Sequence, residues 1–471
     1  SDVSEILASV GHDRPGISDS LTSKCNGNPF YLTHVIRHIG ADFGRPNHDL
    51  VTRRLPMHGR EIVERQLANL PHESRQSLIA AAVIGETFSL KLLAAVLECS
   101  TVSALTAKEP ALRTELVRQL EYDFEFTHAL LREALVESTE ADVTHQLHVR
   151  IAEELQSRPT AGYDAARISD HLADAAPFSS ADSTVHFSRI AAKNASSRFA
   201  YTIARKYFER ALMFQRESPE FSADTQCRTM EDLAVATLHT GDREAARELL
   251  VEAAQIAREN QLPISLSRCA LSLAKDFLSI EVGVYDEEHT ALLQEAISLL
   301  PDSEKSTRSK LLACLSQAIQ WTRSPDSVED LAKLAVSLAE ETGDSNALVA
   351  ALAARAESLH GPKSASLRLS IIGRLRDVSI ASNDTHALLL AHTRALTAHL
   401  ELGDIVSVEA ENEHYRAIAA RTELPQYRWY PTAHDSMLAL LRGELVESAA
   451  LSAQFRKIAG ENPDQNCIQT F

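Results

Sequence analysis

The chain of 471 residues contains 44% hydrophobic and 5% aromatic residues and has a formal net charge of −18. This hydrophobic content excludes a disordered chain, and the scarcity of aromatic residues and of glycine disfavours a β-sandwich or barrel. The negative charge disfavours direct contact with nucleic acid, because such a surface repels a phosphate backbone. A chain of this length usually exceeds one hydrophobic core, so we predict several domains or an open repeat array, predominantly all-α.

The cysteines and the apolar runs favour a cytoplasmic protein. The six cysteines lie far apart and form no CxxC pair, so we expect buried, reduced thiols and neither a disulfide framework nor a zinc site. No apolar run approaches 18 residues, and we therefore expect no membrane span. The cysteines are Cys25, Cys99, Cys227, Cys269, Cys314 and Cys467.

Residues 1–58 are predicted to form a short pair of helices. Asn28 can cap a helix in which Pro29 takes the first position, where its missing N–H costs nothing. His34 and His38 lie four residues apart on this helix, a spacing that can bind a metal. No third ligand is visible, and ordinary surface histidines are the simpler interpretation. Two helices make no core of their own, so we expect their partners upstream and the chain to be a piece of a longer protein.

Residues 59–158 are predicted to form a winged helix. Apolar residues at helical spacing indicate three helices, which end at Pro71, near Gly85 and after Leu97. A strand and two further helices follow, and Thr127 is placed to cap the first of these helices. The string LVRQLEYDFEF offers no Gly or Asn for a tight turn, so the wing is expected to be short or irregular. The strand is indicated by aromatic residues that alternate with acidic ones, namely Tyr122, Phe124 and Phe126.

Residues 159–471 are predicted to form a tetratricopeptide-like array of helix pairs. Turn dipeptides recur between apolar segments, 40 residues apart from 343 to 383 and again from 403 to 443. A fixed helix-pair period of this size is typical of a solenoid. Gly ends one helix in the left-handed conformation, and Asp caps the next helix. The turns are expected at Gly241-Asp242, Gly343-Asp344, Asn383-Asp384, Gly403-Asp404 and Gly443-Glu444.

The polar and aromatic residues of the array suggest no chemistry. Its many Asp and Glu residues are interpreted as solvated helix faces. No nucleophile set and no pair of carboxylates in a recognisable frame appears in the sequence. Trp429 is expected to pack between helices, and the alternative is that it lines a groove.

Four blocks of sequence, in this order, resemble those of the STAND-type signalling ATPases of bacteria. The blocks are GNPFYLTHVIRHI, IVERQLANLPHESRQSLIAAAVIGETFSLKLLAAV, FEFTHALLREAL and LHVRIAEEL. The family includes large ATP-binding LuxR-type regulators and the ATPase portions of some adenylate cyclases. It places a P-loop domain before a helical segment with GNPF, followed by a winged helix and a tetratricopeptide-like array. The chain therefore resembles the part of such a protein that follows the P-loop.

The resemblance implies contacts with a nucleotide at two places. Gly27, Asn28 and Pro29 match the family's segment that lies against the adenine, and the alternative is a simple helix start. His128 matches a winged-helix histidine that, in related ATPases, contacts the β-phosphate of bound ADP. The alternative is a structural histidine that caps its helix or is buried beside Arg132.

The chain has no GxxxxGK[ST] string, whose backbone N–H groups and lysine would surround the phosphates. The nearest string, at 361–364, carries Pro where a flexible glycine is needed. We therefore expect no catalytic residue and no metal in this chain. ATP or ADP is expected to be bound by the full-length protein and not by these residues alone.

The sequence thus predicts the regulatory and sensor portion of an ATP-dependent transcriptional regulator. One alternative is the same module attached to a nucleotide cyclase, and another is a repeat scaffold without a nucleotide switch. The array is expected to bind a protein, peptide or small-molecule signal. We expect no nucleic acid or membrane contact by this segment, and the active form could be an oligomer.

Overall fold

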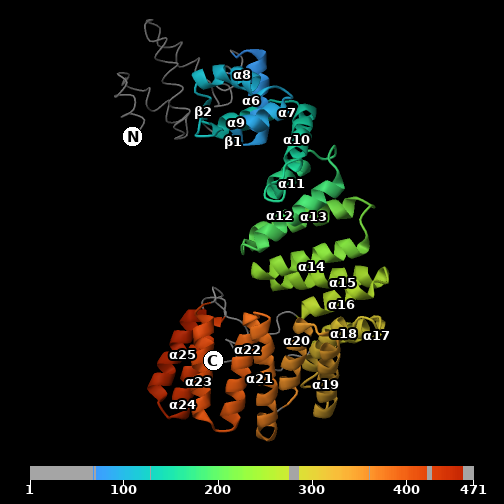
Figure 1. Cartoon of the computed structure of the whole chain (residues 1–471), viewed down its shortest axis with the longest axis vertical. Helices are drawn as coiled ribbons and strands as arrows, with labels where there is room; N and C mark the ends of the chain where they lie inside the picture. The colour runs from blue at the N-terminus through green and yellow to red at the C-terminus, as the bar shows by residue number, and fades with distance from the viewer. Residues whose placement is uncertain are drawn as a thin grey trace, which may run out of the picture. The chain divides into compact units, whose positions relative to one another are not determined.

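The computed structural model describes residue 67 and residues 70–127, 129–274, 286–359, 361–421 and 427–459. In these ranges the chain is predominantly α-helical and has one small sheet (Figure 1). The chain divides into two compact units between Gln215 and Arg216. The predicted all-α class is therefore confirmed.

The first described elements of the first unit form a winged helix. Its sheet has the order β1-β3-β2, and both strand pairs are antiparallel. The elements follow one another as helix, strand, two helices and a two-stranded hairpin. They are α6 (His72–Ile84), β1 (Thr87–Ser89), α7 (Leu90–Val96), α8 (Thr101–Arg113), β2 (Val117–Gln119) and β3 (Asp123–Phe126).

This arrangement differs in detail from the predicted one. Strand β1 and helix α8 were not predicted, and α8 replaces the segment that ends at Pro71 as one of the three helices of the fold. Of the apolar residues predicted for that earlier segment, only Leu67 and Leu70 lie in the described residues. Serine hydroxyls cap the N-termini of α7 and α8. Ser89 accepts from the Leu92 N–H at 3.1 Å, and Ser100 accepts from the Ser103 N–H at 3.0 Å. The wing is short as expected, with strands of three and four residues.

Aromatic side chains of the sheet form part of the core. Phe88 lies opposite Phe124 in the β1–β3 register, and their ring centroids are 6.0 Å apart. Phe124 and Phe126 are buried, as the alternation predicts, because successive side chains of a strand point to opposite faces. The prediction for Tyr122 is wrong. Tyr122 lies in the connection between β2 and β3 and is 84% exposed.

Five further helices follow the winged helix and begin within the first unit. Ile151 and Leu155 are fully buried on one side of α10, as their four-residue spacing predicts. The Thr127 hydroxyl donates to the Glu115 carbonyl at 2.8 Å, and so joins the start of α9 to the chain before β2. The helices are α9 (Ala129–Glu137), α10 (Ala141–Gln156), α11 (Ala165–Asp174), α12 (Ala181–Ser196) and α13 (Tyr201–Glu217).

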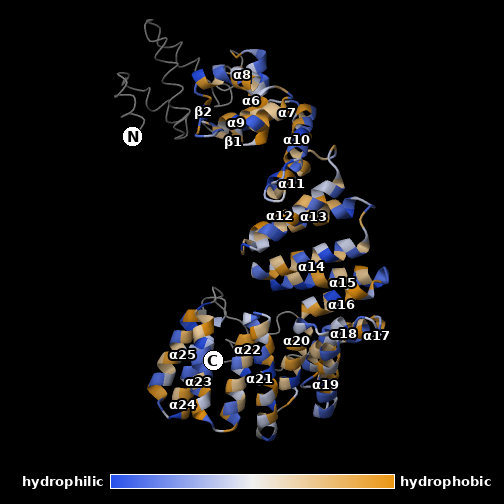
Figure 2. Cartoon of the chain, viewed as in Figure 1, coloured by the Kyte–Doolittle hydropathy of each residue, from blue (hydrophilic) through white to orange (hydrophobic). Residues whose placement is uncertain are grey.

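The second unit consists of successive helices that pack on their neighbours in sequence. Each helix carries both hydrophobic and hydrophilic residues (Figure 2). The helices are α14 (Ala223–His239), α15 (Arg243–Glu259), α16 (Pro263–Leu273), α17 (Glu287–Leu299), α18 (Lys305–Ala318), α19 (Pro325–Thr342), α20 (Ser345–Glu357), α21 (Ala365–Ala381), α22 (Thr385–Glu401), α23 (Ile405–Ala419), α24 (Tyr430–Leu441) and α25 (Leu445–Ala459). A 3₁₀ turn, η1 (Pro362–Ser364), precedes α21.

The predicted turns of the array are confirmed. The first residue of every predicted turn has a positive φ, between 54° at Asn383 and 90° at Gly241. The aspartate that follows caps the next helix, as at Asp384, which accepts from the Ala387 N–H at 3.0 Å. Turns 343 and 383 lead from odd- to even-numbered helices, and turns 403 and 443 lead from even to odd. Each 40-residue spacing therefore joins equivalent positions of successive pairs.

The even-numbered helices from α14 to α22 form a continuous row in the second unit. Each even-numbered helix from α14 to α20 packs on the next even-numbered helix as well as on its neighbours in sequence. No two odd-numbered helices pack to a comparable extent in the described part of this unit. In a stack of helix pairs, the helices that approach each other most closely lie on the inner side of the curve. We call this row, from α14 to α22, the inner face of the array.

Three of the four cysteines in the described residues follow the prediction, whereas Cys25 and Cys467 lie outside those residues. Cys227, Cys269 and Cys314 are buried free thiols. Burial raises the pKa of Cys227 to about 11 and that of Cys314 to about 12, so both remain protonated. Cys99 is exposed, contrary to the prediction, because it lies in the turn that follows α7.

No single helix of the described residues has both the length and the apolar composition to cross a membrane. Helices α7 and α8, bent by 107° to each other, meet that test only as a pair.

Candidate functional site

The residues predicted to contact a nucleotide lie outside the described part of the chain. Gly27, Asn28, Pro29 and His128 all belong to the ranges that the structure does not describe. Arg132 of α9, which the alternative placed beside His128, donates from Nε to the Ala82 carbonyl of α6 at 2.9 Å. The nucleotide contacts implied by the family resemblance therefore stay a prediction.

A cluster of charged side chains joins α14 to α16 on the inner face. Arg268 of α16 donates from Nε to Glu231 of α14 at 3.0 Å, and from Nη2 to Asp224 at 3.2 Å. The side chains of Arg268 and Glu231 are 26% and 13% exposed. Burial lowers the pKa of Arg268, but the hydrogen bonds and charges of Glu231 and Asp224 together outweigh it and raise that pKa overall. Arg268 is thus a permanent cation held at a partly desolvated position.

A second cluster joins α18, α20 and α22 on the same face. Glu357 of α20 accepts from the Gln317 amide of α18 at 2.6 Å through Oε2. Its other oxygen accepts from Arg394 of α22. The Glu357 side chain is 5% exposed, and the Arg394 side chain is 29% exposed. The carboxylate is therefore fully engaged, while its arginine partner still reaches solvent.

The two clusters have equivalent positions in the array. Glu231 and Arg268 are 37 residues apart, and so are Glu357 and Arg394. In each cluster the acid is on one even-numbered helix and the arginine is on the next. We call these residues, together with Gln317, the inner polar row. It consists of Glu231, Arg268, Gln317, Glu357 and Arg394.

The inner polar row is suited to recognition. Half-buried arginines present N–H groups in a fixed fork that matches carboxylates and backbone carbonyls. The acids hold these forks in place, and such positioning reduces the entropy lost on binding. The Cys269 thiol donates to Glu231 Oε1 at 3.8 Å, and burial raises the pKa of this thiol well above its usual range, so it stays protonated. Arginines fixed in this way are typical of sites that recognise carboxylates or carbonyl groups.

Two buried glutamates contradict the prediction that the Asp and Glu residues of the array all lie on solvated helix faces. Glu357 and Glu411 are buried, at 7% and 8% exposure, and are not part of a solvated face. The signal that could have found them is a charge of opposite sign about one repeat away in the sequence. Sequence reasoning also passed over a group of two histidines and Glu411, which is described below.

Trp429 packs in the core, as predicted. Its side chain is 2% exposed. Its ring stacks on that of Tyr430 with centroids 3.9 Å apart, and the centroid of the Phe455 ring lies 6.0 Å from that of Trp429. The alternative, a groove lined by this tryptophan, is therefore excluded.

Comparison with known proteins yields distant structural likenesses only. No family model and no curated protein matches the sequence. A Signal Transduction ATPase with Numerous Domains (STAND) protein with a tetratricopeptide repeat sensor, from Pyrococcus horikoshii, matches at 11% identity and a TM-score of 0.39, over 96% of this chain and 71% of that chain. A Rap protein in complex with competence and sporulation factor matches at 11% identity and a TM-score of 0.43, over 88% of this chain and 100% of that chain. BtubC from P. vanneervenii matches at 12% identity and a TM-score of 0.23, over 66% of this chain and 94% of that chain. With TM-scores below 0.5, none of these likenesses assigns a family.

Proposed function

We propose that this chain is the regulatory and sensor portion of an ATP-dependent STAND-type transcriptional regulator. The inner polar row is the observation that carries the sensor role. It offers charged groups on the face where the even-numbered helices meet. The occupant of this face is a protein, a peptide or a small molecule with acceptor groups for the arginines.

The link to a nucleotide switch rests on the four ordered sequence blocks. In this proposal ATP is bound by upstream sequence, and this chain neither binds nor hydrolyses it alone. Gly27, Asn28 and Pro29 would lie against the adenine, and His128 would contact the β-phosphate of ADP in the resting state. Signal binding on the array would then bias the swing of the winged helix away from the nucleotide.

Two alternatives share the same array. The module could regulate a nucleotide cyclase, or it could be a scaffold with no switch. The residues of the inner polar row suit all three, so the output of the full-length protein distinguishes them.

The test exchanges the charges of one pair in the full-length protein. In the double variant Glu357→Arg with Arg394→Glu, the ion pair can re-form, and Gln317 can turn its amide oxygen toward the new arginine. We expect a normally folded protein whose activation falls several-fold, because a ligand that needs the original charges meets the opposite ones. Transcripts and cyclic nucleotides are measured in cells, and hydrogen exchange checks the fold.

A matched pair on the odd-numbered helices provides the control. Arg258 of α15 donates to Glu295 of α17 at 2.8 and 2.7 Å, also across 37 residues. Exchanging the charges of Arg258 and Glu295 should leave the levels of transcripts and cyclic nucleotides unchanged. A change in transcripts for the inner pair only supports the regulator, and a change in cyclic nucleotide supports the cyclase. If neither output changes, the sensor role of the inner polar row is wrong.

A further inference from the structure

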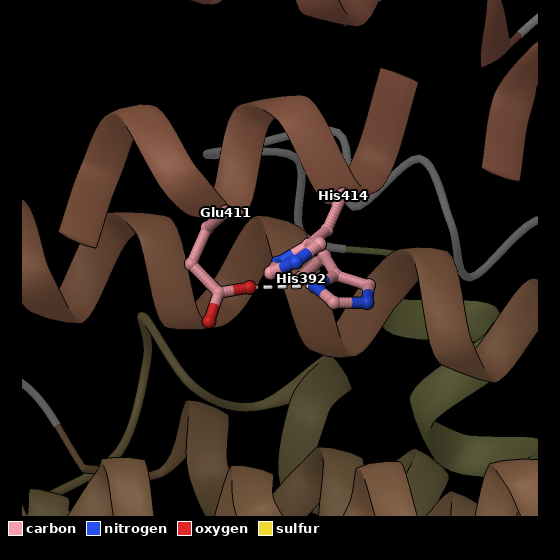
Figure 3. A group of neighbouring side chains, drawn as sticks. All are labelled: His392, Glu411 and His414. Atoms are coloured by element: carbon pink, nitrogen blue, oxygen red, sulfur yellow. Dashed lines mark hydrogen bonds and ion pairs between the residues drawn. The ribbon is translucent and has the colours of Figure 1, made fainter. Parts of the chain in front are cut away.

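Three potential metal ligands converge between α22 and α23. His392 lies on α22, and Glu411 and His414 lie three residues apart on the facing side of α23. One ligand atom of each residue lies within 4.8 Å of the others. Figure 3 shows the carboxylate of Glu411 beside the His392 ring, with the His414 ring next to both. The helix spacing therefore brings two imidazoles and one carboxylate to a single point.

The donor set selects a particular class of cation. Two imidazoles and a carboxylate are ligands of Zn²⁺ and of other late divalent first-row metals, whereas Mg²⁺ and Ca²⁺ prefer oxygen ligands alone. Three protein ligands leave at least one coordination position for water or another ligand. His414 is exposed, so that position is reached from solvent.

The distances are close to those that a cation needs. His392 Nδ1 and Glu411 Oε2 are 2.5 Å apart, joined by a hydrogen bond. The ligand atoms of a tetrahedral zinc site lie about 3.3 Å apart, given bonds of about 2.0–2.1 Å. The ion would fit if His392 Nδ1 and Glu411 Oε2 moved apart by less than about 1 Å and lost the proton that they share. The rings of His392 and His414 have centroids 5.6 Å apart, and rotation of the exposed His414 side chain can close that gap.

A neighbouring arginine holds the carboxylate in a suitable orientation. Arg376 of α21 donates from Nη2 to Glu411 Oε1 at 2.8 Å. This bond occupies one oxygen and leaves Oε2 directed at His392. Metal-binding carboxylates are commonly fixed by such a partner. The guanidinium charge lowers the affinity for a cation, but its hydrogen bond pre-organises the ligand.

His414 is the residue that distinguishes a metal site from a His392–Glu411 pair with only a structural role. The buried His392–Glu411 bond joins α22 to α23 without any ion. His414 adds only a tilted ring contact with His392 to that pair, in the contacts that the structure describes. The packing of α22 on α23 does not need the exposed imidazole of His414, whereas a metal site with three protein ligands does.

We propose that His392, Glu411 and His414 bind one divalent cation of the zinc class, with water completing its coordination. The ion would tie α22 to α23 at the inner edge of the array and present an open position on its surface.

The test is metal binding by the whole chain, with Zn²⁺ and Co²⁺ as probes. Calorimetry should show one Zn²⁺ site of micromolar affinity or tighter, and Co²⁺ should give visible d–d absorption with imidazole ligands. His414→Ala should weaken this site more than tenfold, and Zn²⁺ should increase hydrogen-exchange protection of α22 and α23 in the wild type only. Because His414 is exposed, its variant should fold normally.

His186→Ala is the control, since His186 is an exposed histidine on α12 of the first unit and is not one of the three ligands. It should bind Zn²⁺ as the wild type does, and Mg²⁺ should not bind at the site. Equal Zn²⁺ binding by the wild type and His414→Ala would overturn the proposal. So would the absence of micromolar binding in the wild type.

Discussion

Lys108 shows how a single residue can be at odds with its surroundings. Its side chain is fully buried in the winged helix, and its Nζ lies 3.0 Å from the centroid of the Phe124 ring and 5.1 Å from that of Phe88. The Nζ has no hydrogen-bond partner among the described residues. Burial lowers its pKa from 10.5 to about 7, although the faces of the two rings favour the charged form.

Replacing this lysine should stabilise the winged helix. We expect Lys108→Met to raise the local stability by roughly 1–3 kcal/mol near neutral pH, because an unpaired polar group leaves the core. The measurement is hydrogen exchange of α6 and α8. Since the native state binds fewer protons than the unfolded state between about pH 7 and 10.5, wild-type stability should rise across that window. The advantage of the variant should therefore shrink as the pH rises. An unchanged protection at pH 7 would mean that the ring faces compensate fully for burial.

At the scale of elements, the turns combine local and long-range contacts. Asp344 caps α20 by accepting from the N–H groups of Asn346 at 2.9 Å and Ala347 at 3.2 Å. It also accepts from Ser306 and from the Lys310 ammonium at 3.0 Å, both on α18. The Ser306 bond comes first among the causes that hold its pKa well below 3.8. One carboxylate thus begins a helix and ties it to the previous even-numbered helix.

Substitutions of Asp344 should separate these two roles. Asp344→Ala should cost about 1–2 kcal/mol, because the cap and the bonds to α18 are both lost. Asp344→Asn should cost less, since an amide oxygen still caps the helix. The depressed pKa contributes stability above pH 3.8 that is lost as the pH falls through the folded pKa, and the Ala variant should lack this acid dependence. Hydrogen exchange at the start of α20 measures both effects, and equal losses in the two variants would contradict the division of roles.

At the scale of the whole molecule, the second unit is stabilised between neighbouring helices. Its buried apolar residues form several separate clusters, such as the one that contains Ala234, Ala246 and Leu250. In such an array the stability of each repeat depends chiefly on the repeats beside it. Damage in one cluster should therefore spread only to the adjacent helices.

Leu250→Asp tests this locality. The side chain is 6% exposed, and an unpaired carboxylate in its place should cost several kcal/mol. We expect hydrogen-exchange protection to fall first in α14–α16 and to persist in residues 70–215. Val251→Asp, at an adjacent position that is 48% exposed, is the control and should have little effect. A uniform loss of protection over both units would show one cooperative body and contradict the solenoid.

The sequence by itself determined the features that depend on neighbours a few residues away. Gly241, Gly403 and Asn383 adopt a positive φ because the chain must leave one helix and begin the next there. The following aspartates cap helices for the same local reason, and the alternation of Phe124 and Phe126 decides which side of β3 is buried. These rules predicted the helix pairs and most of the winged helix.

Only the tertiary structure decided which polar residues lie together. Glu357 and Arg394 are 37 residues apart, and His392 meets Glu411 across two packed helices. The same holds for Lys108, whose burial results from the sheet that closes over α8. A charged residue has the same local pattern on a solvated face and in an interior pair. The difference in energy comes from the desolvation and the partners that packing supplies.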